Sequence, residues 1–137
     1  MKEIEAFTHR KDGGPESHVW GYWVIAIRRL FSIILLRFED GSREAYHSHA
    51  FNCLSWVLKG YLIEEHIDGR IEVHPASFWP FVTRRSTYHK VSSVGRSWVL
   101  TFRGPWAKTW REYIEASKKH RVLTWGRRPI LEVPWNN

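Results

Sequence analysis

The sequence predicts an all-β fold, and three observations support this prediction. Short segments rich in β-branched and aromatic residues recur along the chain, as is typical of strands. Glycine, proline and Asp-Gly turn signals separate these segments at intervals of roughly 8–12 residues, the spacing of sandwiches and barrels. Apolar residues make up 43% of the 137 residues, which is enough for a real core in one domain. A jelly-roll barrel of about eight strands fits this length.

The first strands are expected after an N-terminal arm of residues 1–17. The segments 19–29 and 30–39 are apolar and rich in aromatic and β-branched residues, which favours strands over helices. The Asp-Gly-Ser stretch at 40–42 is a turn signal. We therefore expect the second of these strands to end there.

The central part of the chain predicts a hairpin followed by further strands. The segments 53–60 and 61–67 are typical of strands, and the Asp68-Gly69 pair that follows is a strong hairpin signal. The segment 70–74 alternates polar and apolar residues, as a half-buried strand does. Three more strands are expected over 77–84, 88–94 and 96–104.

The C-terminal part allows two interpretations. Residues 106–120 carry apolar side chains at helical spacing, which would suit a short helix. A hairpin formed by TWREYIEA and HRVLTWG is the alternative, and we favour it. Residues 127–137 are expected to lie as an extended tail on the body. Because no repeat, low-complexity stretch or linker divides the sequence, we predict one domain over residues 1–137.

Cysteine content and apolar runs limit the class of protein. The single cysteine excludes an internal disulfide framework, and the N-terminus lacks the apolar stretch of a secretory signal. The longest apolar run, residues 30–36, is far too short to cross a bilayer. We therefore expect a cytoplasmic protein without membrane association.

The charge points to anionic ligands. The chain has 21 Lys and Arg against 14 Asp and Glu, a net charge of +7, and a basic surface attracts anions. Basic residues combined with nine Trp could also bind single-stranded nucleic acid by stacking. However, most of the Trp residues lie inside apolar strands, which favours a place in the core. We therefore expect a small-molecule ligand rather than nucleic acid.

The stretch YHSHAFNC carries the most informative chemistry. His47 and His49 are two residues apart, so on a strand both imidazoles point to the same face. Two neutral imidazoles that face a barrel interior can share a divalent metal at about 2.0–2.2 Å per bond. Other strands must then supply further ligands. His89 is the best candidate for the third, and Glu64 or Glu65 could add a carboxylate.

A structural alternative applies to these residues. A histidine in a β-protein is usually a satisfied polar residue, and an HxH pair occurs by chance on surface strands. Likewise, a cysteine such as Cys53 usually packs as a small hydrophobe. The metal hypothesis therefore depends on the sequence that surrounds the histidine pair.

That surrounding sequence resembles the first signature of the cupin superfamily, G-x5-H-x-H-x(3,4)-E-x6-G. Gly41, His47, His49 and Gly60 fall in register with it, whereas Cys53 stands at the place of the usual glutamate. The resemblance implies an all-β double-stranded β-helix, the jelly-roll barrel of cupins.

The second cupin signature is matched by His89 and by one proline, Pro75 or Pro80, without its second glycine and its asparagine. The longer pattern is similar to a group of small uncharacterised cupin-like proteins of bacteria and phages. The corresponding text here is HSHAFNCLSWVLKGYLIEEH, RRSTYHKV and SWVLTFRGPWAKTW. The resemblance covers about residues 33–102, the expected barrel core.

Cys53 is the departure that bears on chemistry. Thiol dioxygenases of the cupin superfamily also lack the motif glutamate and bind ferrous iron through three histidines. This resemblance implies a metal triad of His47, His49 and His89. The other option for iron is two histidines and one carboxylate, which Glu64 would supply, and we expect Glu64 as a fourth ligand. Fe²⁺ is the expected metal, and Zn, Ni or Mn are the alternatives.

Four residues are candidates for contacts with the substrate. Arg84 and Arg85 precede His89 and could clamp a carboxylate or phosphate with two hydrogen bonds. Cys53 and Trp56 could line the cavity. For Trp56, packing in the core is the more common role of a strand tryptophan.

Two functions are compatible with these features. The first is a non-haem iron dioxygenase that acts on a small anionic or thiol substrate. The second is a cupin module that binds or senses a small ligand without turnover. We also expect a homodimer formed through sheet edges, for which the long apolar strands over 19–39 are suitable.

Overall fold

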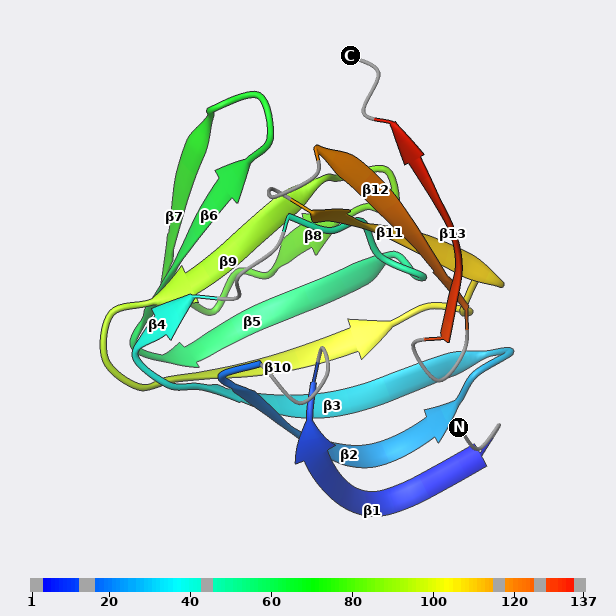
Figure 1. The fold of residues 1–137 in the computed structure, drawn as a ribbon. Coiled ribbons are helices and arrows are strands. Elements are labelled where there is room, and N and C mark those ends of the chain that lie inside the picture. Colours follow the sequence, from blue (N-terminus) through cyan, green and yellow to red (C-terminus); the bar gives the residue numbers. More distant parts are fainter. Residues whose placement is uncertain (1–3, 13–16, 43–45, 115–117, 125–127, 135–137) are drawn as a thin grey trace.

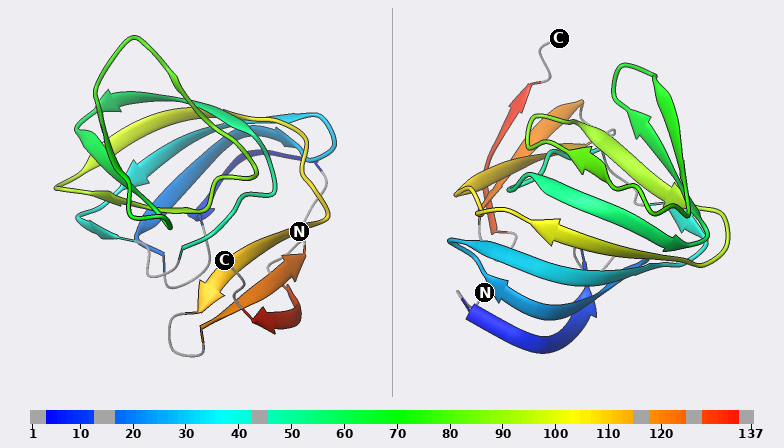
Figure 2. Two further views of the ribbon diagram at one scale, coloured as in Figure 1. Left: turned by 90° about the horizontal axis from the view of Figure 1, so that it is seen from above. Right: turned by 180° about the vertical axis from the view of Figure 1, so that it is seen from behind.

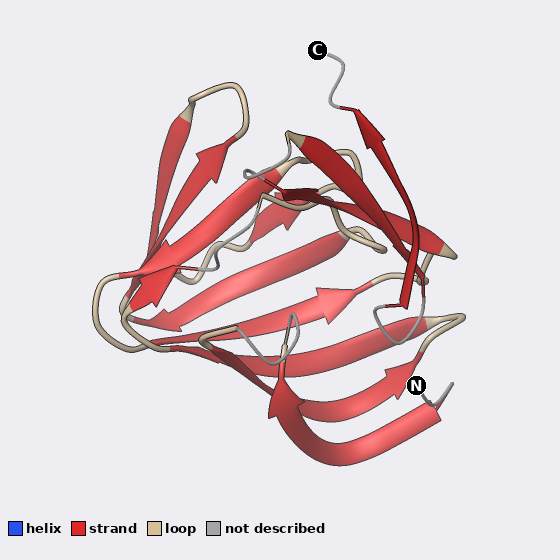
Figure 3. Cartoon of the chain, viewed as in Figure 1, coloured by secondary structure: helices blue, strands red, loops and turns tan. Residues whose placement is uncertain are grey.

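The computed structural model describes residues 4–12, 17–42, 46–114, 118–124 and 128–134. These residues form strands β1 to β13 and no helix (Figures 1 and 3). Within the described ranges there is accordingly no helix that is long and apolar enough to cross a membrane.

Two large sheets and a smaller one make up the fold. The largest sheet has the strand order β1-β2-β3-β10-β5-β8. Its strands are, in that order, β1 (Ile4–Lys11), β2 (Val19–Ile27), β3 (Phe31–Phe38), β10 (Ser97–Arg103), β5 (Cys53–Lys59) and β8 (Phe81–Thr83). The second sheet has the order β4-β9-β6-β7. Its strands are β4 (Gly41–Ser42), β9 (His89–Ser93), β6 (Tyr61–His66) and β7 (Ile71–Pro75).

The third sheet has the order β11-β12-β13, with antiparallel pairing throughout. Its strands are β11 (Thr109–Ile114), β12 (Lys119–Thr124) and β13 (Arg128–Pro134). Figures 1 and 2 show the two large sheets facing each other, with the third sheet beside one end of the space between them. This is the jelly-roll barrel that the sequence predicts.

The core lies between the two large sheets and follows from strand alternation. Every second side chain of β3 and of β10 is buried, because successive side chains of a strand point to opposite faces. The buried apolar cluster consists of Val19, Trp23, Ala26, Ile34, Leu36, Phe38, Val57, Leu62 and Val99. Polar residues occupy the inner face towards one end of these strands, and this end becomes the candidate site.

Gly60 shows why the first motif ends in glycine. It turns β5 into β6 with φ of +80°, a backbone conformation that residues with a side chain rarely adopt. A Cβ at this position would lie 2.4 Å from Ser97 Oγ and 2.9 Å from the Arg96 carbonyl oxygen. Both distances are too short, so only glycine fits here.

Both hairpin predictions are confirmed. The Asp68-Gly69 turn connects β6 to β7, with Glu65 opposite Ile71 as the last pair before the turn. In the C-terminal part, β11 and β12 pair along their whole length, with Thr109 opposite Thr124 at one end and Ile114 opposite Lys119 at the other. The segment is therefore a hairpin, and the helical spacing of its apolar residues does not produce a helix.

The expected arm and tail are largely strands. Residues 4–11 of the N-terminal arm pair with β2 along its length, and residues 128–134 of the tail pair with β12. The first of these strands shows no apolar alternation in the sequence, because Glu5 is its one buried residue. Since β1 covers the outer edge of β2, the apolar strands over 19–39 are not the free edge that the dimer prediction assumed.

Glu5 is buried because it neutralises a buried cation. Arg28 is fully buried, donates from Nη2 to Glu5 Oε2 at 2.9 Å, and lies over the ring of Trp106. Burial alone would raise the pKa of Glu5. Hydrogen bonds from Arg10 and Thr8 and the charges of Arg10 and Arg28 outweigh this effect and lower that pKa.

Replacement of Glu5 by glutamine is expected to destabilise the fold by about 3 kcal/mol at neutral pH, since it leaves Arg28 buried without its counter-charge. The folded-state pKa of Glu5 is lowered, so its contribution is present above the unfolded-state value. It is lost as the pH falls through the folded-state pKa. Urea unfolding of both proteins between pH 7 and pH 2 should show the difference narrowing on acidification. A difference that is independent of pH would contradict this account.

Candidate metal centre

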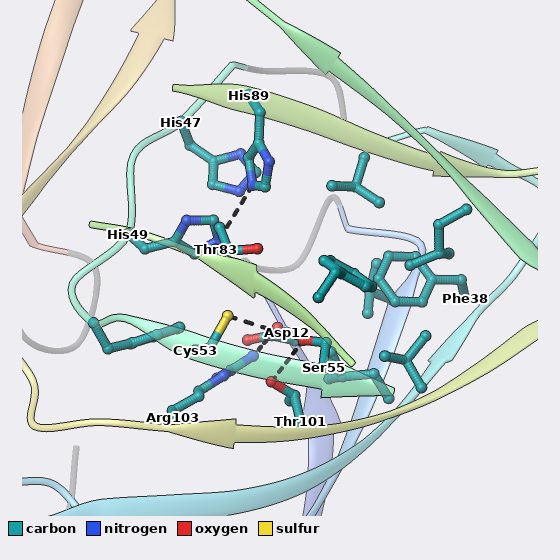
Figure 4. A pocket seen from close by; sticks show the side chains of 17 residues that line it. Asp12, Phe38, His47, His49, Cys53, Ser55, Thr83, His89, Thr101 and Arg103 are labelled. Carbon is teal, nitrogen blue, oxygen red and sulfur yellow. Dashed lines mark hydrogen bonds and ion pairs between the residues drawn. The ribbon is translucent and has the colours of Figure 1, made fainter. Parts of the chain in front are cut away.

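The backbone places two histidines side by side. His47 and His89 form an isolated antiparallel bridge, in which each N–H donates to the other's carbonyl oxygen, at 2.9 Å and 3.0 Å. Directly opposed residues of an antiparallel pair project their side chains to the same face. His49, two residues further on, projects to that face as well. Figure 4 shows the three imidazoles gathered at one end of a cavity.

The three imidazoles are close enough to share one metal ion. One ring nitrogen of each lies within 4.8 Å of the others, and Nε2 of His49 is 3.4 Å from Nε2 of His89. For bonds of about 2.1 Å, this separation corresponds to an angle of about 108° at the metal, close to tetrahedral. Without a metal, the same two nitrogens can share one proton in a hydrogen bond.

Glu64 lies behind His89 rather than beside it. One carboxylate oxygen hydrogen-bonds to Nδ1 of His89, and the other accepts from Nε2 of His74 at 2.9 Å. This bond fixes the ring of His89 with Nε2 directed to the other imidazoles, as carboxylates commonly do for metal-binding histidines. The structure thus places Glu64 outside the group of three, which differs from its expected place as a fourth ligand.

The environment of Glu64 keeps it ionised. The carboxylate is almost completely buried, and burial alone would raise its pKa. Hydrogen bonds from His74 and His89, together with charge on His89 and His66, outweigh burial and hold the pKa of Glu64 well below its usual range. A buried anion is therefore present directly behind the group of imidazoles.

A cavity of about 70 Å³ adjoins the imidazoles, which is room for a few water molecules. Its apolar part is the barrel core. Its polar part is formed by Asp12, His47, His49, Cys53, Ser55, Thr83, His89, Thr101 and Arg103. A small ligand in this space would therefore meet imidazoles at one end and hydroxyl, thiol and guanidinium groups along one wall.

Arg103 is the cation that faces the cavity. It is buried, lies opposite Cys53 in the β5–β10 pairing, and donates to Asp12 Oδ2 at 2.7 Å. Ser55 donates to Thr101 two pairs further along these strands, at 3.1 Å. In Figure 4 the sulfur of Cys53 lies between this wall and the imidazoles. The cavity-facing position expected for Cys53 is thus observed.

The other expected substrate contacts lie elsewhere. Arg84 and Arg85 are exposed and do not line the cavity. The reason is that β8 ends at Thr83, and the N–H of Thr87 then donates to the Arg84 carbonyl in a turn. Trp56 points to the outer face of β5, where its ring meets Phe102 edge to face.

Sequence reasoning missed Arg103 although a signal was present. In SWVLTFR, the last arginine has the same alternation parity as the buried valine and threonine before it. Strand alternation therefore assigns it to the interior. The pair Arg84 and Arg85, close to the candidate ligand His89, is the more conspicuous pattern in the sequence. This pair lies beyond the end of β8 at Thr83.

Solved structures of several differently named proteins are similar to this one. An RmlC-like cupin from Shewanella frigidimarina matches with a TM-score of 0.55 and 18% identity, over 69% of this chain and 81% of that chain. A putative ethanolamine utilization protein Q from Salmonella typhimurium matches with a TM-score of 0.59 and 13% identity, over 70% of this chain and 76% of that chain. HppE with Fe(II) matches with a TM-score of 0.56 and 12% identity, over 70% of this chain and 55% of that chain. No family model and no curated protein sequence matches this chain.

These identities are low, so the similarities establish the fold alone. The chain has the cupin fold, in agreement with the resemblance of its first motif. Because one fold can carry many activities, the reaction has to be inferred from the side chains in the cavity.

A substitution of His49 tests whether the three imidazoles bind a metal. His49 is only half buried, so His49→Ala should fold, and it should bind a divalent metal at this site at least about 100-fold more weakly. Anaerobic equilibrium dialysis with Fe²⁺ or Zn²⁺ measures the change. His18→Ala, which alters an exposed histidine outside this group, is the control. Unchanged affinity in His49→Ala would refute the site.

Proposed function

We propose that this cupin-fold protein holds a divalent metal, Fe²⁺, through His47, His49 and His89 and oxidises a small anionic or thiol substrate with O2. The observation that carries the proposal is the convergence of three imidazole nitrogens within 4.8 Å. The carboxylate of Glu64 behind His89 supports it, since that bond directs Nε2 of His89 into the group.

The donor set is compatible with this metal. Imidazole nitrogen suits iron as well as zinc, copper and nickel. Three neutral imidazoles bring no charge of their own to a divalent ion, and the carboxylate of Glu64 behind His89 offsets only part of its charge. When bound, the ion would supply adjacent open positions for O2 and substrate together with redox capacity. An anionic substrate group is then attracted to the centre by charge.

Residues of the cavity wall would orient the substrate. Arg103 donates from Nη2 to Asp12, and a guanidinium has further N–H donors that can hold a carboxylate at the cavity. The hydroxyl pair of Ser55 and Thr101 adds polar contacts along the same wall. The apolar remainder of the lining excludes bulk water, which strengthens these interactions.

The small cavity favours a small substrate. A volume of about 70 Å³ suits a ligand of a few non-hydrogen atoms. For a thiol, dioxygenation adds both atoms of O2 to sulfur, so RSH and O2 give the sulfinic acid RSO2H, and the reaction needs no other reductant. This stoichiometry makes the proposal testable with O2 alone.

A binding module without turnover is the second candidate. The ion pair between Arg103 and Asp12 favours it, because that pair already neutralises the guanidinium at the cavity wall. Such a module would bind a small ligand beside the metal and would leave O2 unconsumed.

Oxygen uptake distinguishes the two candidates. Protein loaded with Fe²⁺ should consume one O2 for each molecule of a small carboxylate-bearing thiol, and an oxygen electrode with mass spectrometry of the product measures this ratio. His49→Ala should reduce the rate to background, whereas His18→Ala should retain it. If a panel of small thiols and 2-oxo acids binds without O2 uptake, the binding module is the correct function.

Arg103 is expected to determine recognition of the anion. Arg103→Met should raise KM for an anionic substrate about 10- to 100-fold, the value of a charge-assisted hydrogen bond, with a smaller effect on kcat. Arg103→Lys should restore part of the loss. Arg84→Met changes an exposed arginine outside the cavity lining and serves as the matched control. Equal effects at both positions would argue against this role of Arg103.

A further inference from the structure

The inner face of the β6–β7 hairpin carries a second group of side chains of the types that can bind metals. Glu64 and His66 lie two apart on β6, and Glu72 and His74 lie two apart on β7. Glu64 pairs directly with Glu72, so strand alternation places all four side chains on one face. The sequence reads ExH on each strand, on either side of the Asp68-Gly69 turn.

Four of the distances among the donor atoms of these groups are near those of a tetrahedral metal site. Nε2 of His66 is 3.5 Å from Glu64 Oε1 and 3.4 Å from Glu72 Oε2. Nε2 of His74 is 2.9 Å from Glu64 Oε1 and 3.9 Å from Glu72 Oε2. In a tetrahedral site with bonds of about 2.0–2.1 Å, neighbouring donor atoms are about 3.3 Å apart. The four separations lie between 2.9 Å and 3.9 Å, and Glu64, His66 and Glu72 each place one donor atom within 4.8 Å of the others. His74 lies outside that group of three and joins it through Glu64 Oε1.

We propose that Glu64, His66, Glu72 and His74 form a second divalent metal site, distinct from the group of three histidines. Two imidazole nitrogens and two carboxylate oxygens make a donor set that suits Zn²⁺. Two ionised carboxylates also neutralise the charge of a divalent ion.

Two of the four side chains, Glu64 and His74, are held in place before any metal binds. Glu64 is fixed by its hydrogen bond to His89. The ring of His74 stacks on Phe81 at 3.9 Å between centroids, nearly parallel. The side chain of Glu72, by contrast, is 45% exposed. It leaves the site open to solvent, which gives a metal ion a route of entry.

Arg70 distinguishes the metal-bound arrangement from a simple ion-pair network. Its Nη2 lies 3.3 Å from Nδ1 of His66, so in the network Nδ1 accepts and Nε2 carries the proton that faces the carboxylates. A metal on Nε2 requires the proton on Nδ1 instead, and it would displace the exposed Arg70 side chain. Zn²⁺ and a proton therefore compete for the same nitrogen.

The two sites would communicate through one carboxylate. Glu64 contributes Oε1 to the hairpin group and Oε2 to Nδ1 of His89. A metal at the hairpin would hold this carboxylate in a fixed position, and with it the imidazole of His89. The second site does not depend on the proposed oxidation chemistry, because it requires the hairpin residues alone.

Calorimetric titration of chelator-treated full-length protein with Zn²⁺ tests the proposal. The wild-type chain should bind two ions. Glu72→Gln keeps the shape of a partly exposed side chain, so it should fold, and it should bind one of the two ions at least tenfold more weakly. His66→Ala should do the same. His18→Ala, outside both groups, should bind two ions like the wild type.

The variants separate this proposal from the first site. His49→Ala should lose the ion held by the three histidines and retain the ion of the hairpin. The proposal is overturned if Glu72→Gln and His66→Ala still bind two ions with wild-type affinity. It is also overturned if the wild type binds a single ion that only His49→Ala removes, or if the wild type binds none.

Discussion

The antiparallel pairing of His47 with His89 is the constraint on which the site depends. Two backbone hydrogen bonds join the residues, and His47 also bridges to Glu112 on the other side. This short extended segment thereby connects β9 of the four-stranded sheet to β11 of the C-terminal sheet. The same backbone pairing that links these two sheets also directs both imidazoles into the barrel. The arrangement of the sheets and the candidate metal centre therefore depend on the same two hydrogen bonds.

Burial of the Glu64 carboxylate has a cost in stability that its histidine partners offset. Burial of an unpaired ion would be strongly unfavourable, yet Glu64 of β6 has His74 and His89 as hydrogen-bond partners. The inner face of the four-stranded sheet is therefore mixed. Leu62 belongs to the apolar core, whereas Glu64, His66 and His89 are buried polar residues of the same sheet. Glu64 is the residue that the two proposed metal sites have in common.

The opposite wall has another character. Arg103 and Asp12 form an ion pair at the cavity, and Arg28, in the turn between β2 and β3, forms a second ion pair with Glu5 of β1. Both arginines also lie over aromatic rings, which partly replace their lost hydration. Two cations of the chain thus lie in the interior, each paired with a carboxylate.

The sequence by itself determined the fold class, the hairpins and the histidine pair, because these are local patterns. Strand alternation, the Asp68-Gly69 turn and the spacing of His47 and His49 each act within a few residues. The resemblance of the first motif to cupins added the barrel and the choice of His89. The C-terminal hairpin was the favoured alternative, although a helix was equally compatible with the spacing of the apolar residues alone.

Tertiary structure decided everything that depends on pairing between distant strands. The end of β8 at Thr83 turned Arg84 and Arg85 outwards, and the register of β10 on β5 brought Arg103 inwards opposite Cys53. Likewise, the pairing of β6 with both β7 and β9 placed Glu64 behind His89. A slip of one residue in any of these registers would reverse the faces, and no local sequence pattern specifies which strands become neighbours.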